Sequence, residues 1–486
     1  MKRTLIGRLC APAVLVLFAW TPAGAWAAEP VRLGDPRNIN SGNTAWMLVS
    51  TALVLMMTAP GLLLFYGGLL RKKNVLSAMM HCFALMAVVS IVWALIGYSL
   101  AFDVGTPFLG GLRFAMLREV GAAPVEYAPT IPHTVWMAFQ MMFAVITPAL
   151  ICGAYAERIK FSSMLVFSTA WLLLVYCPMA HMVWGKGGLL SCSFGGSIPA
   201  MDFAGGMVVH VSAGISALVA ALMLGRRHGY RTHPMPPHSM VLAVIGAAML
   251  WVGWFGFNAG SALSAGALAG YALLNTHFAA AAGALAWMSI EWIWTGKPTV
   301  LGIISGAVAG LATITPASGF TLPIWAIVIG ASAGIVCYLA ATTLKQILGY
   351  DDSLDVFGVH GVGGALGTIL TGVFAVAMVN TPPGFGNVSK LGLIEGSSTA
   401  LVHQIIAVAI TGGLAVVGSL VILMIVRAVM GLRVPAQDEY AGLDLSQHGE
   451  AGYNLEDEFG STYGEPESTN GELERKPDRL TAAAHI

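Results

Sequence analysis

Eleven long apolar stretches constrain this sequence more than any other feature. A helix needs about 20 mostly apolar residues to cross the hydrocarbon core of a bilayer. The stretches cover residues 44–69, 75–102, 132–153, 161–183, 203–224, 239–260, 267–292, 298–316, 323–345, 355–379 and 402–430. Only 10% of the 486 residues are charged, whereas soluble domains carry about a quarter. The sequence therefore predicts an all-α polytopic membrane protein with eleven transmembrane helices, and its zero net charge gives no sign of nucleic-acid binding.

The first 28 residues have the three-part pattern of a secretory signal peptide. Three basic residues precede an apolar stretch at 11–20, and Ala25-Trp26-Ala27 offers a small-x-small cleavage site. The alternative is an uncleaved first helix. Cleavage would leave residues 29–43 as a periplasmic segment in front of a membrane domain at residues 44–432.

The basic residues predict the orientation, because loops on the cytoplasmic side carry an excess of Lys and Arg. One set of connections holds ten: Arg71, Lys72, Lys73, Arg158, Lys160, Arg226, Arg227, Arg231, Lys297 and Lys345. The opposite set holds only Arg113, Arg118, Lys186 and Lys390. Eleven spans then place the N-terminus outside, in agreement with a signal peptide, and the C-terminus inside the cell (inner) membrane.

Residues 433–486 form the predicted cytoplasmic tail. From residue 451 onward it carries eight acidic residues against three basic ones, a composition typical of disorder. The nearer piece, residues 431–450, has enough apolar residues for a helix that docks on the membrane domain.

A short pattern recurs five spans apart. Asp202 and His210 stand at the fifth span, and DVFGVHG, residues 355–361, opens the tenth. An odd number of spans in each copy inverts the second copy, and inverted repeats often hold a substrate site between them. The pattern favours an inverted 5+5 repeat plus one helix.

Ionisable groups in membrane segments usually face the protein interior or a pathway. We interpret Asp202 as the cap of the fifth helix, since carboxylates suit helix N-termini. His210 and His360 each lie within apolar sequence. Spacing alone does not rank these two above the other histidines in or near spans, which are His81, His277 and His403.

Aromatic residues form two helical stripes. Phe139 and Phe143 are four residues apart, and Trp254, Phe257 and Ser261 follow at offsets of three and seven, so each set shares one helix face. For any single one of these residues, core packing is the better explanation. A further tryptophan, Trp184, falls near a membrane interface, where tryptophan is common.

Several motifs together resemble those of the ammonium transporter family, which includes methylammonium permeases and Rhesus glycoproteins, and most closely its bacterial members. In chain order they are FYGGLLRKKNVLS, AERIKFS, AHMVWGKGG, DFAGGMVVH, GWFGFNAGSA, TPASG and DVFGVHGV. The resemblance extends from about Leu48 to Glu450. It implies a homotrimer with one pore through each subunit, embedded in membrane lipid.

The resemblance also implies roles for individual residues. It implies that Phe143, Trp184 and Ser261 form a recruitment site for ammonium or methylammonium, with Asp202 beneath it. It implies that Phe143 and Phe257 form a gate. It also implies that His210 and His360 line the pore, with Trp254 and Thr315 beside them. Family members are blocked from the cytoplasm by PII signal proteins. The matching surface comprises residues 226–238 and 433–450.

One segment departs from the family pattern. The link from Gly185 to Met201 is longer than usual, and Lys186 follows Trp184 directly. A lysine facing the mouth would repel a cation, so we expect Lys186 to point to solvent.

The implied residues suit ammonium chemically. Aromatic faces attract a desolvated cation by about 2 kcal/mol or more, and a serine oxygen accepts an N–H bond. A bare charge inside an apolar pore costs at least several kcal/mol, on the order of the membrane penalties for ionised side chains. We therefore expect proton and ammonia to separate at a neutral imidazole pair. The sequence leaves open whether ammonia passes alone or together with a proton.

Three other functions compete. One is an ammonium sensor of the same family. Another is an ion-coupled transporter of a small organic cation, which would usually show a midplane carboxylate. The third is an intramembrane metalloenzyme, although no H-E-x-x-H motif occurs and the six cysteines are scattered. We predict a non-enzymatic protein without cofactor or metal.

Overall fold

The computed structural model describes residues 38–453. The predicted signal peptide and the distal tail from residue 454 lie outside the described residues, as does most of the segment 29–43. The described residues contain no β-strand beyond three isolated bridges. Within this described part of the chain, ten helices are long and apolar enough to cross a membrane, and Val300–Ile314 is a shorter apolar helix between two of them. The all-α fold with eleven membrane helices is confirmed.

The first five spans lie between Ser41 and Leu224, and several consist of an α-helix interrupted by a wider π-helical turn. They are α2 Ser41–Met56, η4 Met57–Leu62 and α3 Leu63–Leu69; η5 Lys72–Asn74, α4 Val75–Val92, η6 Trp93–Gly97 and α5 Tyr98–Phe102; α6 His133–Tyr155; α7 Phe161–Trp171, η8 Leu172–Tyr176 and α8 Cys177–Trp184; and η9 Gly206–Val211 with α9 Ser212–Leu224.

The remaining six spans lie between Met240 and Met430. They are α10 Met240–Gly260; α11 Ala267–Thr295; α12 Val300–Ile314; α13 Pro323–Leu339, η10 Ala340–Leu344 and α14 Lys345–Leu348; η11 Phe357–Gly361 with α15 Val362–Phe374; and α16 Thr399–Met430. Short helices in the connections and tail are η7 Ala115–Leu117, η12 Pro383–Phe385, η13 Leu393–Glu395, α17 Ala436–Ala441 and η14 Asp444–His448.

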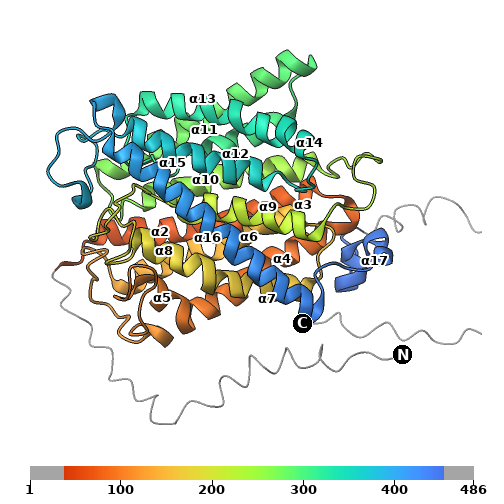
Figure 1. Ribbon diagram of the computed structural model, residues 1–486, viewed down its shortest axis with the longest axis horizontal. Helices are drawn as coiled ribbons and strands as arrows, with labels where there is room; N and C mark the ends of the chain where they lie inside the picture. Colours follow the sequence, from red (N-terminus) through yellow and green to blue (C-terminus); the bar gives the residue numbers. More distant parts are fainter. Residues whose placement is uncertain (1–37, 454–486) are drawn as a thin grey trace, which may run out of the picture.

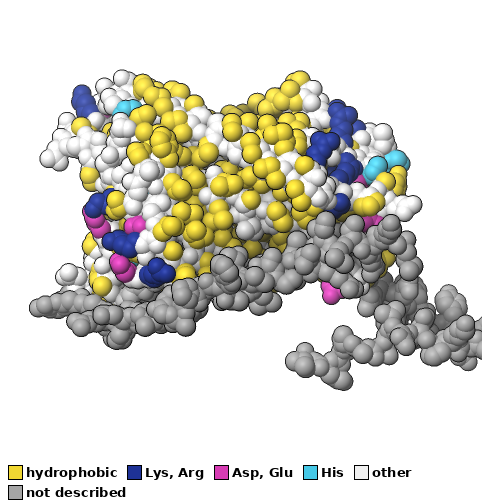
Figure 2. Space-filling view, turned by 60° about the horizontal axis from the view of Figure 1, so that its bottom comes forward, with side chains coloured by type: hydrophobic (Ala, Val, Ile, Leu, Met, Phe, Trp, Pro, Cys, Tyr) yellow, Lys and Arg dark blue, Asp and Glu magenta, His cyan; other side chains and the backbone are white. Residues whose placement is uncertain are grey.

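The long helices run side by side, and α16 crosses the front of the bundle (Figure 1). We call the end where α2 begins the N-face and the end where α17 docks the C-face. On the face that Figure 2 shows, hydrophobic side chains cover the middle, and charged side chains gather toward the two ends. This distribution matches a bilayer, because charge is costly at the depth of the hydrocarbon.

Two spans cross in the middle of the bundle, where α9 with η9 meets α15 with η11. A Cβ atom on Gly214 would overlap the backbone of Gly361, and one on Gly364 would lie 2.8 Å from the Cβ of His210. Only glycine permits so close an approach, as at other small-residue crossings of membrane helices. The crossing brings the fifth and tenth spans together at their histidines.

The carboxylate that corresponds to Asp202 in the second copy is Asp352, not the Asp355 of the DVFGVHG pattern. Asp352 accepts the N–H of Phe357 at the start of η11, at 2.7 Å. Asp355 instead pairs with Lys345, at 2.6 Å. Asp202 precedes His210 by eight positions, and Asp352 precedes His360 by the same eight. The two caps lie at opposite faces, as an inverted repeat requires.

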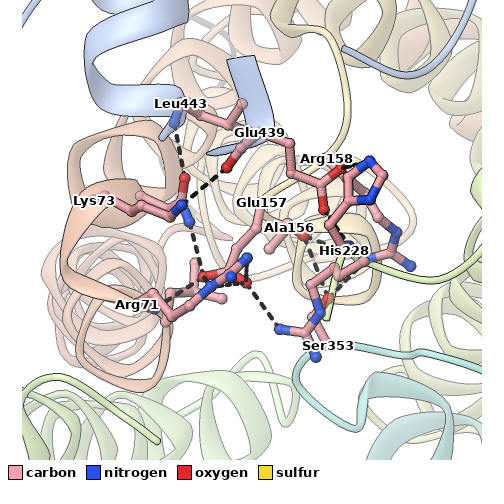
Figure 3. A network of polar contacts seen from close by, with 12 residues as sticks. Arg71, Lys73, Ala156, Glu157, Arg158, His228, Ser353, Glu439 and Leu443 are labelled. Carbon is pink, nitrogen blue, oxygen red and sulfur yellow. Dashed lines mark hydrogen bonds and ion pairs between the residues drawn. The ribbon is translucent and has the colours of Figure 1, made fainter. Parts of the chain in front are cut away.

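The proximal tail docks on the C-face. Asp444 accepts the backbone N–H groups of Leu76 and Ser77 at 3.1 and 2.7 Å and so caps α4. Leu443 N–H donates to the side chain of Asn74, and the Lys73 ammonium donates to the Glu439 carbonyl (Figure 3). The tail is thereby hydrogen-bonded to the first connection of the membrane domain.

Candidate functional site

A cavity of about 250 Å³ opens at the N-face. Its wall combines α6, the C-terminal end of α8, the link after Trp184 and the end of α10. The four residues implied for recruitment all line it: Phe143, Trp184, Asp202 and Ser261. The structure therefore brings together residues that are up to 118 positions apart in the sequence.

Phe143, Trp184 and Ser261 present two aromatic faces and an oxygen to this cavity. The Phe143 and Trp184 rings meet edge to face, with centroids 5.8 Å apart. The Ser261 hydroxyl donates its proton to the Phe257 carbonyl at 2.8 Å. Because that bond uses the only hydroxyl proton, the Ser261 lone pairs can accept an N–H from a bound cation.

Asp202 lies beneath the cavity and acts as a helix cap. Its carboxylate accepts the N–H groups of Gly205, Gly206, Met207 and Val208, at 2.6, 2.6, 2.8 and 3.2 Å. Burial raises the pKa of Asp202, and the four N–H bonds oppose that rise. With both oxygens occupied, Asp202 shapes the wall of the cavity, and its backbone carbonyl accepts the Trp184 indole N–H at 3.0 Å.

Two phenyl rings close the floor of the N-face cavity. Phe143 and Phe257 lie with their centroids 4.3 Å apart and their planes 36° from parallel. Phe143 lines the N-face cavity, whereas Phe257 lines a second cavity of about 20 Å³ beneath it. The pair implied as a gate thus separates two spaces, and a ring must rotate before a molecule can pass.

His210 and His360 lie below the phenyl pair, each within a π-helical turn. Their Nδ1 atoms are 3.2 Å apart and their planes are within 16° of parallel. A neutral imidazole carries one N–H, so one Nδ1 donates to the other. The donor ring then keeps a bare Nε2 and the acceptor ring a protonated Nε2, which gives the pair one accepting end and one donating end.

The π-helical turns help to aim these rings. The His210 N–H bonds to the Gly205 carbonyl, five residues earlier, and π-turns of this kind are frequent at functional sites. The His210 Nε2 has no hydrogen-bond partner among the described residues. His210 and His360 both line the 20 Å³ cavity.

The path continues to the C-face. His360 lines both the small cavity and a third one of about 250 Å³, which reaches Ser353 and Asp355. The path from the N-face to the C-face therefore has five parts in order. They are the N-face cavity, the phenyl pair, the small cavity, the histidine pair and the third cavity. Within residues 38–453, no group of three His, Cys, Asp or Glu side chains could hold a metal ion.

Trp254 and Thr315 have different places. Trp254 lines the small cavity, and its ring lies over His210 with the centroids 5.4 Å apart. Thr315 is fully buried and accepts the Trp254 indole N–H at 2.9 Å. Thr315 therefore holds Trp254 in position, while Trp254 itself borders the path.

The link from Gly185 to Met201 contributes to the N-face cavity in a way that its sequence did not reveal. Lys186 points away and pairs with Glu126 at 2.7 Å, as expected for a solvent-facing lysine. Cys192, Ser193 and Phe194 instead line the cavity, as does Gln140 of α6. Gln140 could have been noticed, because a polar residue one turn before Phe143 is unusual in an apolar span.

Comparisons with known proteins agree with this architecture. The family model described as "Ammonium Transporter Family" matches residues 45–453. An ammonium transporter of Bacillus subtilis is 47% identical over 412 residues, which cover 85% of this chain and 98% of that protein.

Solved structures give the same result. The crystal structure of Saccharomyces cerevisiae Mep2 has a TM-score of 0.76 and 37% identity, and covers 83% of this chain and 92% of its own. That of Candida albicans Mep2 has a TM-score of 0.77 and 35% identity, with 86% and 91% covered. This chain belongs to the ammonium transporter family.

Proposed function

We propose that the protein conducts ammonium across the cytoplasmic membrane, taking it up at the N-face and releasing it at the C-face. The observation that carries this proposal is the series of cavities, in which an aromatic cavity lies above a phenyl pair and a hydrogen-bonded histidine pair. Relatives that are named ammonium transporters and share up to 47% of the sequence support the same substrate.

Recruitment uses Phe143, Trp184 and Ser261. The two rings attract the cation, and the Ser261 oxygen accepts one of its N–H bonds. Asp202 acts indirectly, because its carboxylate is fully occupied as a cap. Rotation of Phe143 or Phe257 then admits the substrate to the small cavity.

The histidine pair removes the cost of carrying a charge. His210 and His360 offer one accepting nitrogen and one donating nitrogen, so a proton can be taken up at one end and given back at the other. Ammonia is neutral and avoids most of the penalty that a cation meets in an apolar pore. Potassium cannot lose a proton and is excluded.

The charge distribution supports the assignment of the two faces. The connections at the C-face contain ten basic residues and those at the N-face four, so the C-face is assigned to the cytoplasm. We further propose a homotrimer, and a PII-type signal protein that binds residues 226–238 and the docked segment 433–450. A pull-down with a purified PII protein, with and without ADP, tests the second point, and absence of capture in both conditions overturns it.

Uptake of radiolabelled methylammonium into proteoliposomes, with competition by ammonium, tests the main proposal. A transporter accumulates label and ammonium lowers the rate. A sensor binds methylammonium without accumulation, and that result would replace the proposal. Current recorded on addition of ammonium separates the two transported species, since ammonia alone carries no charge.

A further inference from the structure

The N-face cavity is larger than one ammonium ion requires. Its volume is about 250 Å³, whereas a water molecule, which is close to ammonium in size, occupies roughly 30 Å³. Along α6 the wall runs from Trp136 to Phe143, which is about 10 Å at 1.5 Å per residue. The Phe143, Trp184 and Ser261 site occupies only the deep end, so space remains above it.

Aromatic rings also line this outer part. Tyr127 and Phe194 meet edge to face with centroids 4.9 Å apart, and Tyr127 stacks on Trp136 at 5.7 Å. Phe194 belongs to the long link, which is held by backbone bonds. The Phe194 carbonyl accepts the Gly187 N–H at 2.9 Å, and the neighbouring Cys192 carbonyl accepts the Gly384 N–H at 2.6 Å. The ring therefore stands on a fixed wall.

Gln140 supplies a free acceptor on the same wall. The residue is only 6% exposed, and its Oε1 has no hydrogen-bond partner among the described residues. A buried polar atom without a partner costs about 1–3 kcal/mol. The Oε1 itself has almost no accessible surface, so the Gln140 amide, which lines the cavity, must turn toward an N–H donor there before a hydrogen bond can remove that cost. None of the described residues that line the cavity is Lys, Arg or His, so no fixed cation opposes a second one.

We propose that the N-face cavity contains a second cation position, formed by the rings of Phe194 and Tyr127 and the amide oxygen of Gln140. Its ligands are small alkylammonium ions up to tetramethylammonium. Ammonium and methylammonium pass through this position on their way to Trp184, whereas tetramethylammonium is too bulky for the Phe143–Phe257 contact and blocks the cavity. The inference rests on the proposed function, because inhibition is read from transport.

The two wall elements recognise different chemistry, and this makes the test sharp. Tetramethylammonium has no N–H, so it can use the rings but not Gln140. Methylammonium has three N–H groups and can use both. The contributions of the ring and of the amide to binding can therefore be told apart. One of the two side chains is substituted, and the effects on tetramethylammonium and on methylammonium are compared.

The experiment measures methylammonium uptake by the full chain in proteoliposomes, with tetramethylammonium as inhibitor. Tetramethylammonium should compete with methylammonium without being accumulated. Phe194→Leu should weaken that inhibition about 3- to 10-fold, the range expected for loss of one cation–π contact. Gln140→Leu should raise the KM for methylammonium about 5-fold, the loss expected for one hydrogen bond, and leave the inhibition constant of tetramethylammonium within twofold.

Two further variants serve as controls. Phe194→Tyr keeps the ring and should keep the inhibition, which shows that a loss in Phe194→Leu is not a folding defect. Phe108 lies 57% exposed in an N-face connection, outside the cavity, so Phe108→Leu should match the wild type. If wild-type uptake is normal but tetramethylammonium fails to inhibit, or both substitutions behave as the wild type, the second position is refuted. If the wild type takes up no methylammonium at all, the proposed function fails first.

Discussion

Gly364→Ala tests the histidine pair without removing either imidazole. The added Cβ would lie 2.8 Å from the Cβ of His210 and 3.0 Å from the Gly206 carbonyl oxygen. Carbon atoms in contact prefer about 3.5 Å, so α15 must retreat from η9 by roughly 0.7 Å, the difference from the 2.8 Å separation. Both neighbours are rigid, because one is backbone and the other is the first carbon of a side chain.

That retreat is large enough to break the bond between the rings. The Nδ1 atoms of His210 and His360 are 3.2 Å apart, and a further shift of roughly 0.7 Å takes them beyond the range of a hydrogen bond. A typical hydrogen bond contributes about 1 kcal/mol, which corresponds to about a fivefold effect. We expect methylammonium uptake to fall about 5- to 10-fold in Gly364→Ala.

Uptake into proteoliposomes measures the effect, and Gly413→Ala is the matched control. Gly413 also lies within a membrane helix, but a Cβ there would meet nothing within 4 Å, so its variant should transport at the wild-type rate. The role of the pair would be refuted if a solved structure of the Gly364→Ala variant showed the two rings moved apart while its uptake stayed at the wild-type rate.

Three further predictions follow from the described contacts. His210→Leu or His360→Leu should stop uptake or abolish selectivity against potassium, measured by competition and by potassium current; unaltered flux and selectivity would exclude a proton relay. Lys186→Ala should leave the KM for methylammonium within twofold, because its ammonium pairs with Glu126 outside the cavity; a tenfold change would place it at the mouth. Glu157→Gln should lower the temperature of half-inactivation at neutral pH, because breaking a buried ion pair costs about 3–5 kcal/mol. Heating in detergent at several pH values should show the difference from the wild type shrinking at low pH, and a pH-independent difference would refute the ionic explanation.

The sign of the Glu157 prediction comes from its surroundings. Burial raises the pKa of this carboxyl, but Arg227 and Arg71 outweigh it and hold the pKa below its usual value. A depressed pKa contributes stability that is complete above the ordinary value, about 4.3, and is lost as the pH falls through the folded value. Figure 3 shows Glu157 beside Arg71 at the centre of this C-face network.

Hydropathy predicted the number of spans because each needs only a long apolar run, but it could not choose among the histidines. His81 stacks on Phe161, His277 lies beside Trp251, and His403 bonds to the Pro199 carbonyl. Neither spacing nor composition distinguishes these settings from those of His210 and His360. The distinction arises from contacts between distant spans, and family resemblance supplied it where local reasoning did not.

The wall of the N-face cavity was beyond sequence reasoning for a similar cause. Phe194 stands in a polar, glycine-rich link, where an isolated aromatic residue predicts nothing by itself. Its position depends on bonds such as that between Gly384 and Cys192, which join two connections 192 positions apart. Such pairings leave no periodic signal in either segment.

The meeting of His210 and His360 follows from the inverted repeat and not from either segment alone. In both copies a buried carboxylate precedes a histidine by eight positions, and its cap fixes the start of a π-helical turn that contains the histidine. One span begins at the N-face and the other at the C-face, so equal spacings carry both rings to the same depth. Gly214, Gly361 and Gly364 then let the two spans cross at contact distance. The pair therefore requires the cap spacing and the glycines at once, and a change in either separates the rings even when both imidazoles remain.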